Sequence, residues 1–170
     1  MRLLQDITDE SGASAVELVI AVPIVLMLAC ALLDGAQLVV SASQAQGAAA
    51  AAARTVMADP SLTADIWGSG TLLKTLKTAA LSDAPSVDED QLTVSFSWDG
   101  LTRRSYSHRF SATDSSKTRS STVTTQRDTV TVYIDRPWAT ALGKAVSGSD
   151  KLHVEASATV DVDMTNGSNW

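Results

Sequence analysis

The chain is poor in the residue types that most often carry catalysis or bind metals. It contains one cysteine, Cys30, two histidines, and only 5% aromatic residues. A single cysteine cannot form an internal disulfide, so an exported domain would have to be held together by packing. His108 and His153 fall in strand-like patterns, without a nearby carboxylate pair or a glycine-rich phosphate loop. We therefore expect no enzymatic activity, no cofactor and no metal site.

Basic residues are also few. Lysine and arginine number 13 against 19 aspartates and glutamates, which gives a formal net charge of −6 and a pI near 4.7. A nucleic-acid-binding protein would carry a basic stripe, and a protein held to anionic lipid by charge would carry a basic patch. The sequence predicts neither class.

One long apolar run dominates the N-terminal part. Sixteen uncharged residues, Leu18 to Leu33, lie between Glu17 and Asp34, and small or apolar residues flank them. A bilayer span needs about 20 apolar residues, so we predict a transmembrane segment at about 16–40. Its two acidic residues would lie near the two interfaces, where a charge costs less than at mid-bilayer. Pro23 removes one backbone hydrogen bond and is expected to kink this transmembrane helix.

Gly12 and Ala13 suggest a processing site before the run. Cleavage between them would leave the amine of Ala13 one helical turn from Glu17, so that amine and carboxylate could neutralise each other within or between chains. This is the arrangement of a prepilin N-terminus. Two alternatives stay open: a secretory signal cut near Ser41-Ala42-Ser43, and a lipoprotein box ending at Cys30.

A second helical segment follows the span. Gln37 to Met57 is rich in alanine, the best helix former, and Asp59-Pro60 should end it. The long helix, at 13–58, should pack closely against something through its small side chains. Leucines and alanines at helical spacing predict another helix at about 70–82.

The remainder predicts an α+β domain with an antiparallel sheet of about four strands packed on helix. Alternating apolar residues mark Leu92 to Trp98, Tyr106 to Phe110, Val130 to Ile134 and Leu152 to Met164. Asp99-Gly100 predicts a hairpin between the first two strands. Further features are a loop at 111–122 and a polar tail at 166–170. Between Ile134 and Leu152 we expect a short helix that has Pro137 in its first turn and contains Trp138, Leu142 and Val146.

The N-terminal segment resembles the TadE/TadG-like family of the tight-adherence (Flp) pilus system. The resemblance lies in the sequence from Glu10 to Leu18, the apolar run with Pro23, the pair Asp34-Gly35, and the Gln- and Ala-rich helix at 44–54. It implies a prepilin-peptidase substrate cut at Gly12–Ala13, with Glu17 pairing with a subunit N-terminus. The implied partners are the peptidase, other pilin or pseudopilin subunits, the pilus assembly platform and the membrane.

These observations give a domain plan and a functional hypothesis. We expect a leader at 1–12, a long helix at 13–58 and an extracytoplasmic α+β domain at 59–170, with the leader cytoplasmic. The leading hypothesis is a minor pilin or pseudopilin of the cell membrane, at an initiating or tip position in a surface pilus. The alternative is a membrane- or lipid-anchored extracytoplasmic binding domain unrelated to a pilus.

Overall fold

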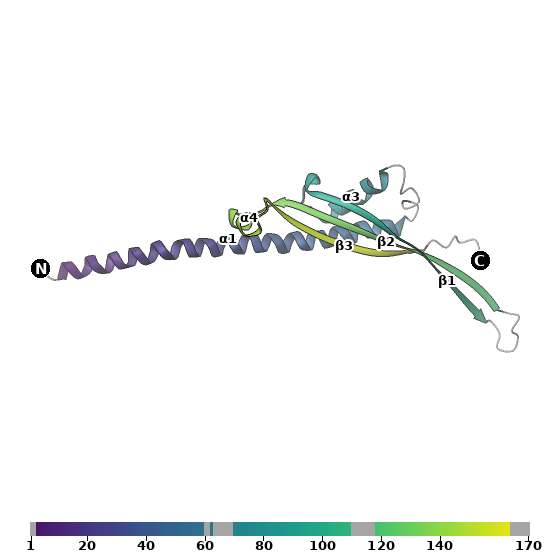
Figure 1. Ribbon diagram of the computed structural model, residues 1–170, viewed down its shortest axis with the longest axis horizontal. Coiled ribbons are helices and arrows are strands. Elements are labelled where there is room, and N and C mark those ends of the chain that lie inside the picture. Colours follow the sequence, from purple (N-terminus) through teal and green to yellow (C-terminus); the bar gives the residue numbers. More distant parts are fainter. Residues whose placement is uncertain (1–2, 60–61, 63–69, 110–117, 164–170) are drawn as a thin grey trace. The chain divides into compact units, whose positions relative to one another are not determined.

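The computed structural model describes residues 3–59, 62, 70–109 and 118–163 (Figure 1). Side chains are described within these ranges except at 3–14, 107–109 and 118–121. The chain divides into two compact units. The first combines residues 1–40 with 136–152, and the second combines 41–135 with 153–170.

Helix α1 (Leu3–Ala58) is one continuous element of 56 residues that contributes to both units. Its sequence lacks glycine pairs and carries a single proline, Pro23, inside the helix. The alanine-rich second half favours helix by intrinsic propensity. The helix ends at Ala58, at the place that the Asp59-Pro60 pair predicted.

The first unit joins the N-terminal part of α1 to a short helix, α4 (Ala141–Ser147), which lies beside it (Figure 1). Thr140 caps α4 by accepting the Leu142 N–H, and Gly148 ends it with a positive φ of 69°. The short helix predicted here is present and contains Leu142 and Val146, but it begins at Ala141 and not at the predicted Pro137. Pro137 is the last residue of strand β2, and Trp138 precedes α4, because the capping hydroxyl that starts the helix belongs to Thr140.

The second unit contains helix α3 (Thr71–Asp83), a 3₁₀ turn (Glu89–Gln91) and most of a three-stranded sheet. The strands are β1 (Leu92–Arg109), β2 (Thr118–Pro137) and β3 (Lys151–Asp163), in the order β1-β2-β3. β1 and β2 pair antiparallel. β3 is also antiparallel to β2. The hydrogen-bonded side-chain pairs between the two strands are Arg127–Asp161, Thr129–Thr159 and Asp135–His153, so residue numbers increase along β2 as they decrease along β3.

The core of this unit lies between helix and sheet, as the α+β prediction required. Helix α3 packs against β1, and the second half of α1 and one face of the sheet are buried with it. The strict alternation predicted for the last strand is confirmed, since every second residue of β3 is buried or half-buried. The main buried side chains are Val56, Leu72, Leu76, Leu92, Val130, Val132, Ile134, Val154, Val160 and Val162.

The sheet has three strands, so the prediction of about four was wrong. Asp99-Gly100 does not form a hairpin turn. Trp98 pairs with Asp128 and Leu101 pairs with Gln126, so two residues of β1 face one residue of β2 in a bulge. Gly100 supplies the positive φ, 104°, that this bulge uses. An Asp-Gly pair suits both a tight turn and a bulge, and the 20-residue partner strand β2 selects the bulge here.

The same long pairing corrects the predicted loop at 111–122. Residues 118–122 belong to β2 and pair with residues 105–109 of β1. Serine and threonine are compatible with this exposed ribbon because their hydroxyls can pair across the strands, as those of Ser105 and Thr122 do at 3.2 Å. Phe110, the residues at 111–117, Met164 and the predicted tail lie outside the described residues.

Candidate functional site

The first unit presents an almost uncovered apolar helix. From Ala15 to Val40 nearly every side chain of α1 is exposed, including the large ones Val16, Leu18, Val19, Ile20, Val22, Ile24, Val25, Leu26, Met27, Leu28, Leu32, Leu33, Leu38, Val39 and Val40. A contiguous apolar surface of this size marks a contact with membrane or protein. By length and composition, α1 is compatible with a single-pass membrane anchor.

The residues that the sequence singled out lie along this helix. Gly12 and Ala13 are both helical within α1. Glu17 is one turn further on, its side chain is exposed, and none of the ion pairs among the described residues includes it. Pro23 is also exposed, inside the helix. Gly12 and Ala13 therefore lie about one turn before Glu17 on the same helix.

Asp34, at the other end of the uncharged run, is buried in the first unit. Only 6% of its surface is exposed. Its Oδ1 accepts the backbone N–H of Thr140 at 2.8 Å, and its Oδ2 accepts the Thr140 hydroxyl at 2.6 Å. A buried carboxyl group needs such partners because its desolvation is costly. The same Thr140 oxygen accepts the Leu142 N–H at 3.2 Å, so the cap of α4 is coupled to Asp34.

Gln37, one turn after Asp34, holds the same segment through its amide. Its Nε2 donates to the carbonyl oxygen of Pro137 at 2.7 Å, and its Oε1 accepts the Ala139 N–H at 2.6 Å. The NH₂ group of a primary amide donates and its oxygen accepts, so one glutamine side chain can bind a backbone carbonyl and a backbone N–H at the same time. A neighbouring β-strand pairs with a backbone in the same way. We call Asp34 and Gln37, together with residues 137–140, the clasp.

Gly143 shows how closely α4 approaches α1. It is buried, and a Cβ atom at this position would lie 2.5 Å from Cε3 of Trp138 and 2.8 Å from Oδ2 of Asp34. Both distances are shorter than van der Waals contact. Only glycine therefore fits here without displacing the tryptophan ring or the carboxyl group.

Sequence reasoning missed the clasp. It placed Asp34 at a membrane interface, but nothing local indicates a partner 106 residues away. The one available signal was Thr140, a preferred N-cap residue just before a short apolar helix. The other half of the clasp, Gln37, looked like an ordinary polar residue of a helix.

The alanine-rich part of α1 finds its packing partner inside the second unit. Ala45, Ala48, Ala49, Ala52 and Ala53 are at most 3% exposed. The small side chains allow close approach to the end of α3, where the Cβ of an alanine at Gly47 would lie 3.1 Å from Oδ2 of Asp83. Gln44 also donates to the Ser86 hydroxyl at 2.6 Å. The expectation of close packing through small side chains is met by the protein's own helix and sheet.

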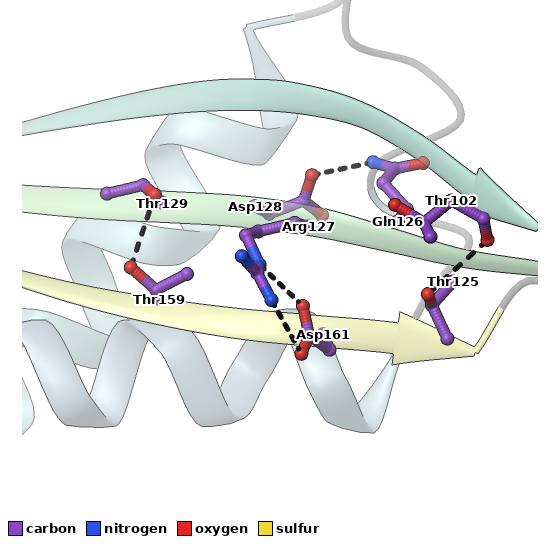
Figure 2. A network of polar contacts seen from close by, with 8 residues as sticks. All are labelled: Thr102, Thr125, Gln126, Arg127, Asp128, Thr129, Thr159 and Asp161. Carbon is purple, nitrogen blue, oxygen red and sulfur yellow. Dashed lines mark hydrogen bonds and ion pairs between the residues drawn. The ribbon is translucent and has the colours of Figure 1, made fainter.

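A second polar cluster lies on the sheet (Figure 2). On one face Arg127 of β2 donates to Asp161 of β3 at 2.9 Å, and this bond lowers the pKa of Asp161 and raises that of Arg127. On the other face Asp128 is fully buried, and burial raises the pKa of its carboxyl group. Gln126 donates to Oδ1 of Asp128 at 2.8 Å, while Oδ2 has no partner among the described residues.

An open hollow adjoins the Arg127–Asp161 pair. It measures about 480 Å³, and its lining includes Tyr106 and charged residues of both signs, among them Asp99 and Arg104. His153, the histidine whose side chain is described, lies elsewhere. Its Nδ1 is 2.6 Å from Oδ1 of Asp135, and its ring stacks on Tyr133. The described residues contain no group of three or more metal-ligating side chains.

Comparison with known families identifies the segment that carries the exposed helix. Residues 12–54 match the family model of the TadE-like proteins. The N-terminal segment of this chain is TadE-like. The match begins at Gly12, includes Glu17 and the clasp residues of α1, and ends within the alanine-rich part. No curated protein and no solved structure matches the chain. The resemblance stated from the sequence is thus confirmed, and it supports a protein associated with the Tad pilus.

Proposed function

We propose that this protein is a membrane-anchored minor pilin or pseudopilin that takes part in the assembly of a tight-adherence pilus, at its initiation or tip. The observation that carries the proposal is the exposed apolar half of α1, headed by Glu17, within a TadE-like segment. A helix that is apolar on all sides requires lipid or other helices around it. A membrane subunit that later enters a filament meets both environments in turn.

Glu17 is the residue on which the assembly role depends. The prepilin peptidase would cut between Gly12 and Ala13 and leave a free amine four residues from the Glu17 carboxyl group. Burying an unpaired carboxylate among apolar helices costs desolvation free energy, and a neighbouring ammonium group offsets part of that cost. The amine of an adjacent subunit can supply this charge as well as the protein's own amine can. Correct register between subunits then follows from charge pairing, while apolar contact supplies the binding free energy.

The size of the second unit supports a terminal position. This unit comprises residues 41–135 and 153–170. Repeated in every subunit, a folded unit of this size would crowd a thin shaft. At a tip or at the start of the filament it meets no such restriction. We expect the protein to act by packing with other subunits and with the assembly platform, and to have no catalytic role.

Replacement of Glu17 tests the proposal. Glu17→Ala and Glu17→Gln should both leave the protein in the membrane fraction but reduce the number of pili by at least tenfold, measured by electron microscopy and shearing. Glu155→Gln is the matched control, since it removes an exposed carboxylate on β3 and should leave piliation unchanged. Normal piliation in both Glu17 variants would refute the assembly role of this residue.

N-terminal sequencing of the membrane-extracted protein tests the processing step. A start at Ala13 supports the prepilin route, and Gly12→Ala should then keep the leader attached. A lipid on Cys30 would favour the alternative of a lipid-anchored binding domain. A start near Gln44 would favour a secreted domain, which would have lost the exposed helix altogether.

A further inference from the structure

The clasp lies where the membrane should end. Along an α-helix, with a rise of about 1.5 Å per residue, Asp34 lies roughly 26 Å and Gln37 roughly 30 Å beyond Glu17. The hydrocarbon core of a bilayer is about 30 Å thick, with headgroup layers of several ångströms on each side. If Glu17 marks one boundary of the hydrocarbon core, the clasp and the α4 helix that it holds fall at the opposite boundary, where hydrocarbon meets the headgroup layer. This step rests on the proposed membrane anchoring.

The helix remains apolar on its other sides at the level of the clasp. Leu32, Leu33 and Val39 are 75%, 59% and 68% exposed, so the clasp covers one face of α1 and leaves the rest bare. The apolar surface of α1 thus continues past Asp34, although the side chain at this position ends in a carboxyl group. Burying the carboxyl group under Thr140 removes it from contact with lipid, which makes the continuation possible.

Helix α4 adds apolar surface of its own. Val146 is 81% exposed, the highest value among the exposed large hydrophobic residues of the described chain. Leu142, half-buried, lies one turn earlier on the same side. Lys144 has a long stem that can follow an apolar surface while its amine stays in water, and it pairs with Asp150.

We infer that residues 137–147 form a membrane-contacting foot that rests at the boundary between hydrocarbon and lipid headgroups, on the side opposite Glu17. The clasp holds this foot on α1, and Val146 contacts lipid. The occupant of the exposed surface of α4 is the bilayer itself, because that surface is attached to the candidate span at its boundary. The foot would fix the depth of the anchor helix and resist its movement along the membrane normal.

Site-directed spin labelling of the full chain tests the inference. The protein is prepared with Cys30→Ala and one new cysteine, and is reconstituted at low density in vesicles of phosphatidylcholine and phosphatidylglycerol. Labels replace Val146 in the foot, Leu26 in the span, and Thr93, an exposed residue of β1. Collision rates with oxygen, which enters lipid, and with a water-soluble nickel chelate then report the depth of each label.

The expected result is nickel access several-fold lower at Val146 than at Thr93, and lowest at Leu26. Adding Asp34→Ala, or separately Gln37→Ala, should raise nickel access at Val146 toward the value at Thr93, while Leu26 stays protected. A Val146 label as accessible as Thr93, with Leu26 protected, overturns the foot and leaves the anchor intact. An accessible Leu26 label would refute the anchoring proposal itself. Protection of Val146 only at high protein density would show that a second copy covers it, which also overturns the inference.

Discussion

Replacement of Gly143 by alanine is the sharpest test of the clasp, because the atoms that the added methyl group would contact are known. In Gly143→Ala the new Cβ would lie 2.5 and 2.7 Å from two ring carbons of Trp138, and 2.8 Å from Oδ2 of Asp34. Neither neighbour can yield freely. Oδ2 of Asp34 is fixed by the Thr140 hydroxyl, and the ring is part of the same packed segment.

The expected cost follows from these contacts. Overpacking of this kind costs about 1–3 kcal/mol, and displacement of Asp34 would weaken hydrogen bonds to a charged group that are worth about 1.5–3 kcal/mol each. Alanine returns up to about 1 kcal/mol through its better helix propensity. A net loss of about 2 kcal/mol in the stability of the closed clasp would raise its opening equilibrium roughly 30-fold.

Hydrogen–deuterium exchange of the peptide covering 137–147 measures this opening in detergent or nanodiscs. The Ala139 and Thr140 amides, which donate to Gln37 and Asp34, should exchange faster in the variant by about the factor given above. Gly35→Ala is the matched control, since a Cβ there meets nothing within 4 Å, and it should leave exchange unchanged or slower. Unaltered exchange in Gly143→Ala would show that α4 does not press on α1 as described.

Further predictions concern the second unit. Leu76→Ala, at a fully buried position of α3, should lower the free energy of unfolding by about 2–5 kcal/mol in denaturant melts, whereas Leu73→Ala on the exposed side of the same helix should lower it much less. Burial raises the pKa of Asp128, so ionisation of this residue costs stability as the pH rises through that raised pKa. Asp128→Asn should therefore raise the melting temperature at neutral pH. A lower melting temperature in this variant would count against the reasoning. Arg127→Gln should raise the pKa of Asp161 toward its ordinary value in an NMR titration, since the Arg127 hydrogen bond is the main cause of the lowered pKa. The stability that this pair adds is present at neutral pH and is lost as the pH falls through the lowered pKa of Asp161. An unchanged pKa of Asp161 in the variant would contradict the assignment.

Several features of the protein could be read directly from the sequence because their causes are local. The uncharged run from Leu18 to Leu33 fixes a helix that is apolar on every side. The alternation from Leu152 onward fixes β3 and the identity of its buried face, since successive side chains of a strand point to opposite sides. The segment from Gly12 to Arg54 carries enough of its pattern in order to indicate the TadE-like family.

Other features depend on partners far away in the chain, and only the tertiary structure decided them. Asp99-Gly100 could serve a turn or a bulge, and it became a bulge because β2 continues to pair beyond it. Asp34 could lie in water or among lipid headgroups, and it is buried because Thr140, 106 residues later, supplies two hydrogen-bond donors to its carboxyl group. The local sequence determines which conformations and environments a residue can adopt. Contacts with residues distant in the chain then determine which of these it adopts.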